Sequence, residues 1–200
     1  MNAPGAGWPD ALLVAGPAAS GKTVLATALA AAAGYVLFDL DQVTGPLTDA
    51  ALALVGETPD ALDRAGPGRD LRRARYACLT GAAAANLDAG HRVVVAAPFS
   101  AECADPAAFA ALCAALGQDV GRRVMLVYLE TPAPLLGERL ARRNAPRDRA
   151  KLRADDRPVP PAPRVPHLRV DATRAVDAQI EELSARLGPI RTAPTESPRC

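Results

Sequence analysis

Lysine, aromatic residues and net charge are all scarce in this sequence. Only two of its 23 basic residues are lysines, Lys22 and Lys151, aromatic residues make up 4% of the 200 residues, and the formal net charge is +1. A nearly neutral chain lacks the broad positive field that attracts duplex DNA or an anionic membrane. We therefore expect neither DNA nor a membrane as a partner, and the abundance of arginine alone indicates no function.

The sequence also lacks paired cysteines and long apolar runs. None of its four cysteines has the Cys-x-x-Cys spacing of a metal or redox pair, and a chain of this length needs no disulfide scaffold. The first residues do not show a basic segment followed by an apolar one, and the longest apolar run, residues 24–38, is shorter than the ~20 residues of a membrane span. We expect reduced thiols and a cytoplasmic protein.

Short apolar runs alternate with helical patterns along the chain. The expected strands are residues 10–15, 35–40, 91–96, 123–129 and 167–170. The expected helices are residues 22–33, a short one between Gly45-Pro46 and Thr58-Pro59, 70–88, 105–116, one from Pro132 or Pro134 to Arg143, and 174–187. Nearly continuous apolar strands that alternate with helices predict a parallel sheet covered on both faces, and so a three-layer α/β fold. The expected domain is 10–191, between a flexible N-terminus, 1–9, and a flexible tail, 192–200.

Residues 16–23 fit the phosphate-binding pattern G-x-x-x-x-G-K-[ST], between an expected strand and an expected helix. In this pattern, backbone N–H groups and the helix N-terminus surround a phosphate, the lysine reaches the outer phosphates, and the hydroxyl ligates Mg²⁺. The candidate nucleotide-binding residues are Gly16, Pro17, Ala18, Ala19, Ser20, Gly21, Lys22 and Thr23, with Lys22 also catalytic and Thr23 a metal ligand. The motif predicts nucleotide binding and leaves the reaction open.

With this motif, residues 12–187 resemble the P-loop kinases of the nucleoside-monophosphate-kinase-like group, which includes gluconate kinase, chloramphenicol phosphotransferase and zeta toxin. The resemblance implies a five-stranded parallel sheet in the order 2-3-1-4-5. It also implies ATP and Mg²⁺ as cofactors and a mobile lid, at about 138–166.

Two carboxylates, Asp39 and Asp41, follow the second expected strand, at the edge where parallel sheets place their ligands. In an extended segment both side chains share one face. The resemblance implies that a carboxylate here contacts the acceptor hydroxyl and acts as base, and Asp39 is the first choice and also the second Mg²⁺ contact. Which of the two is the base stays open, as does the alternative that Asp41 caps a turn and Asp39 is solvated.

Further acceptor contacts are expected on the helix that begins near residue 70. Arg72, Arg75 and Tyr76 lie three and four residues apart and therefore on one helical face, which is either a substrate-binding wall or a solvated surface. The third expected strand ends without an acid, in Ala-Ala-Pro-Phe at residues 96–99. This absence disfavours motor-type and AAA-type ATPases, in which an acid at that place holds Mg²⁺ and a neighbouring acid activates water.

The lid is expected to carry three catalytic arginines. Arg139 and Arg143 are four residues apart on one helical face, and Pro146 places Arg147 on a flexible segment. The resemblance implies that such arginines stack on adenine, a role given to Arg139, or neutralise the transferring phosphoryl group. The alternative is an arginine-rich surface helix. Thr173 follows the fifth expected strand and is a candidate nucleotide contact or a helix cap.

The sequence therefore predicts an ATP-dependent kinase that phosphorylates a hydroxyl of a small polar molecule. The alternatives are a kinase with a macromolecular or sugar-nucleotide acceptor, and a non-catalytic ATP-binding regulatory module. The identity of the acceptor and the choice between monomer and homodimer are left open.

Overall fold

The computed structural model describes residues 7–58, 62, 67–143 and 161–190. Strands and helices alternate along the chain, as the apolar pattern predicts. The strands are β1 (Ala11–Ala15), β2 (Val36–Asp39), β3 (Val93–Ala96), β4 (Val124–Glu130) and β5 (Leu168–Asp171). The helices are α1 (Lys22–Ala33), α2 (Leu40–Leu54), α3 (Pro67–Asp88), α4 (Ser100–Ala104), α5 (Pro106–Ala115), the short 3-10 helix η2 (Gln118–Val120), α6 (Ala133–Arg143) and α8 (Val176–Leu187).

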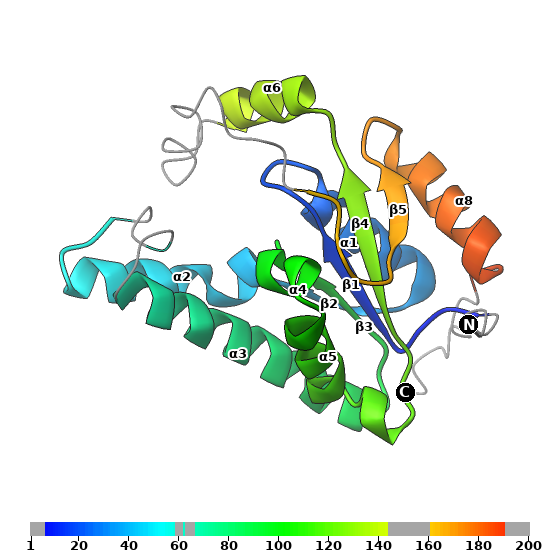
Figure 1. Cartoon of the computed structure of the whole chain (residues 1–200), viewed down its shortest axis with the longest axis horizontal. Coiled ribbons are helices and arrows are strands. Elements are labelled where there is room, and N and C mark those ends of the chain that lie inside the picture. The colour runs from blue at the N-terminus through cyan, green and yellow to red at the C-terminus, as the bar shows by residue number, and fades with distance from the viewer. Residues whose placement is uncertain (1–6, 59–61, 63–66, 144–160, 191–200) are drawn as a thin grey trace, which may run out of the picture.

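The five strands form one parallel sheet in the order β2-β3-β1-β4-β5 (Figure 1), which confirms the predicted order. The register places Leu12 of β1 between Val94 of β3 and Met125 of β4. Every residue of β1 is buried, because this strand lies in the middle of the sheet with a helical layer on each side. The carboxyl ends of all five strands lie at one edge of the sheet, where parallel sheets bind their ligands.

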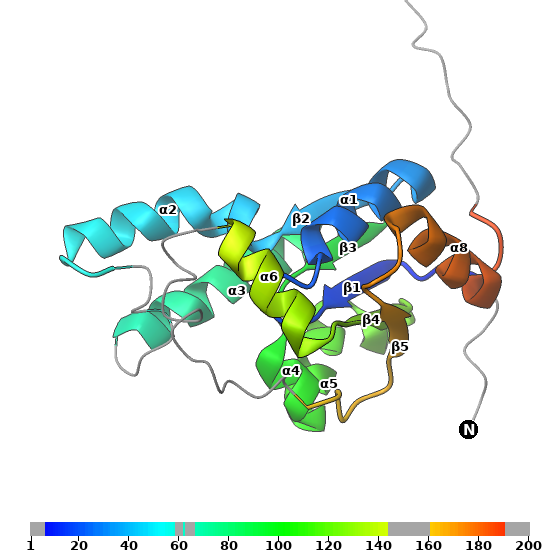
Figure 2. The same ribbon diagram turned by 90° about the horizontal axis from the view of Figure 1, so that it is seen from above.

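Two apolar cores, one on each face of the sheet, make the fold three-layered (Figure 2). Alternate residues of β1 serve opposite cores: Leu13 packs in the cluster with α3, and Leu12 in the cluster with α1 and α8. In Figure 2, α1 and α8 lie on one side of the sheet and α3, α4 and α5 on the other. Among the described residues, no helix is long and apolar enough to cross a membrane.

The second strand is followed at once by a fifteen-residue helix, α2, rather than by an extended segment and a later short helix. Asp39 caps this helix through its carboxylate, which accepts from the backbone N–H groups of Asp41 and Gln42. Pro46 therefore lies inside α2, and the prediction of a break at Gly45-Pro46 is wrong. One proline removes one helical hydrogen bond, and we attribute its tolerance to the face of α2 that packs against α3.

The two ends of the described domain meet beside the sheet. The Trp8 indole donates a 2.9 Å hydrogen bond to the Gly188 carbonyl, and the Tyr35 hydroxyl donates one of 2.6 Å to the Pro9 carbonyl. Trp8 and Pro9 thus make specific contacts with the domain, although the expected boundary lies at residue 10. The remainder of the expected N-terminal segment, 1–6, and the expected tail, 192–200, lie outside the described residues.

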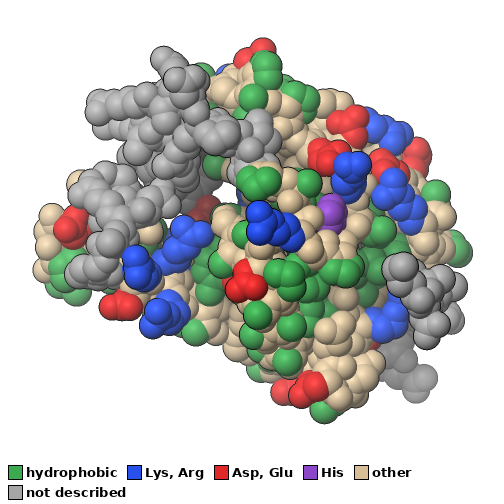
Figure 3. Space-filling view, in the orientation of Figure 1, with side chains coloured by type: hydrophobic (Ala, Val, Ile, Leu, Met, Phe, Trp, Pro, Cys, Tyr) green, Lys and Arg blue, Asp and Glu red, His purple; other side chains and the backbone are tan. Residues whose placement is uncertain are grey.

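Basic and acidic side chains are intermixed over β5 and α8 in the view of Figure 3. Here Arg169 pairs with Glu130 at 3.2 Å, and Glu182 pairs with both Arg174 and Arg186, at 3.1 and 2.7 Å. Paired charges of opposite sign do not add up to a field of one sign. This part of the surface therefore has no strong electrostatic preference for a polyanion.

Candidate active site

The loop between β1 and α1 has the backbone shape of a phosphate cradle. Gly16, Ala19 and Gly21 all have positive φ angles, of 148°, 63° and 100°. A Cβ at position 16 would lie 2.8 Å from Ser20 Oγ and 3.2 Å from the Leu129 carbonyl oxygen, so the loop can pass β4 only with glycine there. The N-terminus of α1 has no side-chain cap, which leaves its first N–H groups and partial positive charge available to an anion.

Lys22 lies across this loop. Its ammonium donates hydrogen bonds of 3.0 Å to the Gly16 carbonyl and 2.7 Å to the Pro17 carbonyl. Both contacts are to backbone oxygens of the cradle itself, so the charge is held beside the concave side of the loop. A bound phosphate would attract the same charge more strongly, since an ammonium–phosphate contact joins two full charges.

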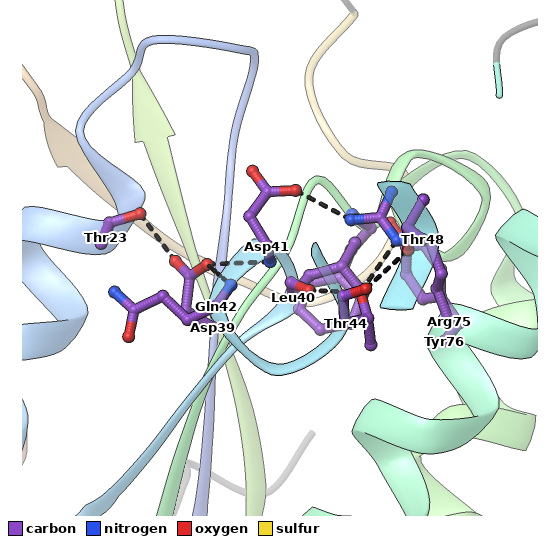
Figure 4. A network of polar contacts seen from close by, with 10 residues as sticks. Thr23, Asp39, Leu40, Asp41, Gln42, Thr44, Thr48, Arg75 and Tyr76 are labelled. Atoms are coloured by element: carbon purple, nitrogen blue, oxygen red, sulfur yellow. Dashed lines mark hydrogen bonds and ion pairs between the residues drawn. The ribbon is translucent and has the colours of Figure 1, made fainter. Parts of the chain in front are cut away.

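The predicted metal ligands, Thr23 and Asp39, meet in the structure (Figure 4). The Thr23 hydroxyl donates a 2.6 Å hydrogen bond to Asp39 Oδ2, while Oδ1 caps α2. Asp39 is 6% exposed, which excludes the alternative that it is merely solvated. A hydroxyl and a carboxylate are the hard oxygen ligands that Mg²⁺ prefers, and both belong to rigid elements.

The described residues contain no cluster of three His, Cys, Asp or Glu side chains that would hold a metal by itself. Mg²⁺ in nucleotide sites usually takes one or two protein ligands and completes its shell with water and phosphate oxygens. The pair formed by Thr23 and Asp39 fits an ion that arrives with a nucleotide.

Asp41 lies in the first turn of α2, where Arg75 of α3 holds it (Figure 4). Arg75 Nη2 donates a 2.8 Å hydrogen bond to Asp41 Oδ1, and Arg75 Nε donates one of 2.9 Å to Thr44 Oγ1. The Arg75 side chain is 12% exposed and that of Asp41 is 46% exposed. The predicted arrangement of Asp39 and Asp41 along one extended face is wrong, because the helix begins between them and turns the two side chains to different partners.

Tyr76, the neighbour of Arg75, connects α3 to the turn after β3. Its hydroxyl accepts a 3.3 Å hydrogen bond from the Phe99 backbone N–H, and its ring lies edge-on to the Phe99 ring at 6.0 Å between centroids. Phe99 has a φ of 47°, an uncommon conformation for a residue with a side chain. Burial raises the pKa of Tyr76 to about 12, so the hydroxyl keeps its proton at neutral pH. The guanidinium carbon of Arg72 lies 5.9 Å from the centre of the Tyr76 ring.

One cavity of about 710 Å³ joins these groups at the carboxyl edge of the sheet. Its described lining comes from the phosphate loop and α1, from α2 and α3, from the end of β3, and from α6 and the start of α8. The lining residues are Ala18, Ala19, Ser20, Gly21, Lys22, Thr23, Val24, Leu25, Asp39, Leu40, Asp41, Leu62, Arg72, Arg75, Tyr76, Ala96, Ala97, Pro98, Arg139, Ala172, Arg174, Val176 and Gln179. The structure thus brings the predicted phosphate, carboxylate and α3 residues into one space.

The end of β3 contributes Ala96, Ala97 and Pro98 to the cavity. None of these side chains can ligate a metal or take a proton. The structure therefore places no acid at this point of the wall, as the sequence predicts, and the carboxylates that line the described cavity are Asp39 and Asp41.

Of the three arginines predicted to be catalytic in the lid, Arg139 is the one whose side chain the structure describes. It donates hydrogen bonds of 3.2 Å to the Ser20 carbonyl and 2.9 Å to the Ala172 carbonyl, which join α6 to the phosphate loop and to the loop after β5. The Arg143 side chain and all of Arg147 lie outside the described residues, as does most of the expected lid. At the far end of the expected lid, the Arg164 backbone N–H donates a 2.8 Å hydrogen bond to the Cys103 carbonyl.

The loop after β5 is closed by its own side chains. Thr173 donates from its backbone N–H and its hydroxyl to Asp171 Oδ1, at 2.8 and 2.7 Å, and these bonds lower the pKa of Asp171. The neighbours of Thr173, Ala172 and Arg174, line the cavity. Gln179 of α8 also lines it, and sequence reasoning missed this residue because a single glutamine in a helix carries no distinguishing pattern.

A family model described as an AAA domain matches residues 12–157 of this chain. The matched region contains the phosphate loop, both carboxylates, the arginines of α3 and all of α6. The missing acid after β3 disfavours ATPase chemistry of the AAA type. No curated protein sequence matches the chain significantly.

Several solved structures that carry kinase names share this fold. The chain resembles a putative kinase from Chloroflexus aurantiacus (TM-score 0.63, 20% identity, covering 90% of this chain and 96% of that one). It also resembles an APS kinase from Mycobacterium tuberculosis in complex with AMPPNP and APS (0.60, 23% identity, 92% and 99%). A third is a gluconokinase from Sinorhizobium meliloti (0.58, 20% identity, 90% and 93%). At these identities the likeness establishes the fold alone.

Proposed function

The chain belongs to the AAA-domain family whose model matches residues 12–157, and from this premise we propose that it is an ATP-dependent kinase that phosphorylates a hydroxyl group of a small polar molecule. The observation that carries the proposal is the hydrogen bond between Thr23 and Asp39. It brings the end of the phosphate loop and the carboxylates after β2 together in one cavity. Phosphoryl transfer needs this proximity, since its catalysis consists mainly of positioning and charge stabilisation.

On the nucleotide side, the cradle binds the phosphates and Lys22 supplies the charge beside the outer ones. The Thr23 hydroxyl and the Asp39 carboxylate would hold Mg²⁺. The ion, when bound, neutralises charge on the phosphate oxygens. Asp39 already uses Oδ1 to cap α2 and Oδ2 to accept from Thr23, so we assign it to the metal rather than to the acceptor.

On the acceptor side, Asp41 is the better candidate for the base. Its side chain is 46% exposed, it lines the cavity, and Arg75 fixes one of its two oxygens. A carboxylate at this place in the cavity can accept a hydrogen bond from an acceptor hydroxyl, orient that hydroxyl and then take its proton. This assignment reverses the sequence-based preference for Asp39. Arg72 and Tyr76 line the neighbouring part of the cavity, where the Arg72 guanidinium would attract an anionic or polar substituent of the acceptor.

The end of β3 contributes Ala96, Ala97 and Pro98 to the cavity and lacks the acid that motor-type ATPases carry at this place, which supports a hydroxyl acceptor over water. A cavity of about 710 Å³ is within the size range of small-molecule sites. Both observations support a kinase over a motor ATPase and over a kinase of a large acceptor.

The test is transfer of the labelled γ-phosphate from ATP, with Mg²⁺, to the members of a library of small hydroxylated metabolites. We expect the wild-type protein to phosphorylate one or a few chemically related compounds, and the Lys22→Ala variant to phosphorylate none. Transfer that persists in Lys22→Ala, or tight ATP binding by the wild type with no labelled product across the library, would contradict the proposal. The second outcome favours a regulatory ATP-binding module.

A further inference from the structure

The cavity extends beyond the phosphate loop on the side opposite Asp41. In the sheet order β2-β3-β1-β4-β5, the phosphate loop follows the central strand, and the acceptor residues follow β2 at one edge. Ala172, Arg174, Val176 and Gln179 line the cavity after β5, at the other edge. Phosphates held at the centre, with the acceptor on the β2 side, leave the β5 side for the nucleoside. The residues there are therefore the ones that can distinguish one base from another.

Gln179 is a buried polar side chain in this part of the cavity, with 7% of its surface exposed. Its Nε2 donates a 2.8 Å hydrogen bond to the Arg174 carbonyl. A carbonyl only accepts, so this bond fixes which end of the side-chain amide is nitrogen and which is oxygen. This hydrogen bond joins the loop after β5 to α8, and it fixes the orientation of the Gln179 side-chain amide.

The oxygen of the same amide faces the cavity without a partner in the described part of the chain. The hydrogen bond of the Gln179 side chain is the one that Nε2 donates. The described buried side-chain atoms without a partner are Ser20 Oγ, Thr131 Oγ1 and His167 Nε2, so Oε1 is not sealed inside the protein. Since the residue is nearly buried and lines the cavity, the accessible face of Oε1 is the cavity itself. It is a fixed hydrogen-bond acceptor.

Apolar and cationic groups accompany this acceptor. Val24, in the first turn of α1, is 61% exposed and lines the cavity, as does Val176. Arg139, held by the Ser20 and Ala172 carbonyls, presents a guanidinium to the same space. The exposed Val24, the half-buried Val176 and the Arg139 guanidinium are suited to the flat faces of an aromatic base, and the Gln179 oxygen to its polar edge.

We propose that Gln179 selects adenine nucleotides, by accepting a hydrogen bond from the exocyclic amino group of the base. Adenine presents an amino donor where guanine and hypoxanthine present a carbonyl oxygen. With guanine or hypoxanthine, two acceptors face each other and the Gln179 oxygen is left without a donor in a desolvated site. The amide cannot rotate to offer its nitrogen without breaking the bond to the Arg174 carbonyl. This inference rests on the proposed function, because it takes the nucleotide to be bound by the phosphate loop.

The test is displacement of a ribose-labelled fluorescent ATP analogue from the full chain, with Mg²⁺, by ATP, ITP and GTP. We expect ATP to bind the wild type at least ~10-fold more tightly than ITP or GTP, as for a buried hydrogen bond whose loss is worth more than about 1.4 kcal/mol. Gln179→Met keeps the length of the side chain and removes both polar atoms. It should reduce the preference for ATP over ITP to about 3-fold or less.

A purely structural role of Gln179 in closing the loop would weaken ATP and ITP binding alike and leave their ratio unchanged. Glu182→Gln is the matched control, because it breaks the 3.1 Å ion pair with Arg174 and leaves the Gln179 amide in place. Its ATP-to-ITP ratio should equal that of the wild type.

Equal affinity of the wild type for ATP and ITP overturns the inference, and so does a wild-type ratio retained in Gln179→Met. If Gln179→Met does not fold, the wild type is titrated with purine riboside triphosphate, which lacks the exocyclic amino group. If this compound binds as tightly as ATP, the inference about Gln179 is again overturned. Failure of the labelled analogue to bind the wild type at all, in contrast, would contradict the proposed function itself.

Discussion

The Thr23 hydroxyl lies 2.6 Å from Asp39 Oδ2, a contact that joins residues from the first turn of α1 and the last position of β2. The two residues are adjacent because β1 and β2 are both paired to β3, in a parallel register that brings their carboxyl ends to one edge. The contact couples the phosphate loop to α2, since the same Asp39 carboxylate caps that helix. Under the proposed function, this contact would connect nucleotide and metal binding to the wall on which the acceptor would lie.

Replacing Lys22 by alanine should abolish nucleotide binding or turnover without unfolding the domain. The ammonium hydrogen-bonds two loop carbonyls, and Lys22 is not a member of either apolar core, so we expect its removal to leave the core packing intact. We expect ATP affinity to fall by ~10-fold or more, as for a lost charge-assisted contact worth about 1.5–3 kcal/mol. Displacement of the fluorescent ATP analogue measures the loss, and an unchanged circular dichroism melting curve shows that folding is not its cause.

Asp39 has a capping role and a proposed metal role, which two substitutions separate. Asparagine is as good a helix cap as aspartate, so Asp39→Asn should keep thermal stability close to that of the wild type while raising the Mg²⁺ concentration for half-maximal ATP binding. Asp39→Ala loses the cap as well and should be destabilised by about 1 kcal/mol. A Mg²⁺ dependence in Asp39→Asn equal to that of the wild type contradicts the metal assignment.

Asp41→Asn should leave ATP binding nearly unchanged and lower phosphoryl transfer by ~10²-fold, as is typical of a lost general base. The measurement is single-turnover transfer to the acceptor found in the metabolite screen, with ATP at saturation. Asp49→Asn, on the same helix and exposed, is the matched control and should transfer at the wild-type rate. If Asp39→Asn shows the loss of transfer with saturating Mg²⁺ and Asp41→Asn does not, Asp39 is the base.

Arg75 should stabilise the pairing of α2 with α3 through Asp41 and Thr44. Arg75→Met removes both hydrogen bonds and keeps much of the aliphatic packing. We expect a loss of about 1–3 kcal/mol in the free energy of unfolding, measured by urea. Combined with Asp41→Asn, the loss should be less than additive, because the two substitutions remove a shared contact. Strict additivity would mean that the ion pair contributes nothing in solution.

Stability should decline in alkaline solution, because burial raises the pKa of two thiols and of Tyr76. The pKa values of Cys103 and Cys113 rise from 9.0 to about 11, and that of Tyr76 rises from 10.0 to about 12. Each group stays protonated to a higher pH in the folded state than in the unfolded state. Its contribution to the free energy of unfolding is therefore complete below the unfolded pKa and is lost as the pH rises through the folded pKa. Urea unfolding at about pH 8 and about pH 11 measures the decline. Cys113→Ala should reduce it, whereas Cys78→Ser, at an exposed thiol, should not.

The phosphate loop, residues 16–23, and the strand order are both predictable from the sequence. A phosphate loop is encoded within eight consecutive residues, because the glycines that shape the loop and the lysine and threonine that contact the phosphates and the metal are all close together in the sequence. The strand order followed from the resemblance that this motif supports. The helix at 105–116 was predicted with Pro106 in its first turn, and the structure places Pro106 at the start of α5.

Helix α2 and the carboxylates at its start could be predicted only in part. The sequence located Asp39 and Asp41 at the end of a strand, but the pattern of apolar residues did not show that a helix begins between them. The proline at position 46 pointed to a break, and packing of α2 on α3 overrides that local preference. The different partners of the two carboxylates follow from this helix start.

By itself, then, the sequence determined the α/β class, the phosphate loop and a set of residues that line the cavity, since each depends on short-range spacing or on the alternation of strands and helices. Only the tertiary structure decided that Asp39 bonds Thr23, that Arg75 holds Asp41, and that the Gln179 oxygen faces the cavity. The contacts of Asp39 and Arg75 join residues 16 and 34 positions apart, and the environment of Gln179 combines α8 with α1 and the phosphate loop. Such proximity arises from how the helices pack around the sheet, which no local pattern of residues specifies.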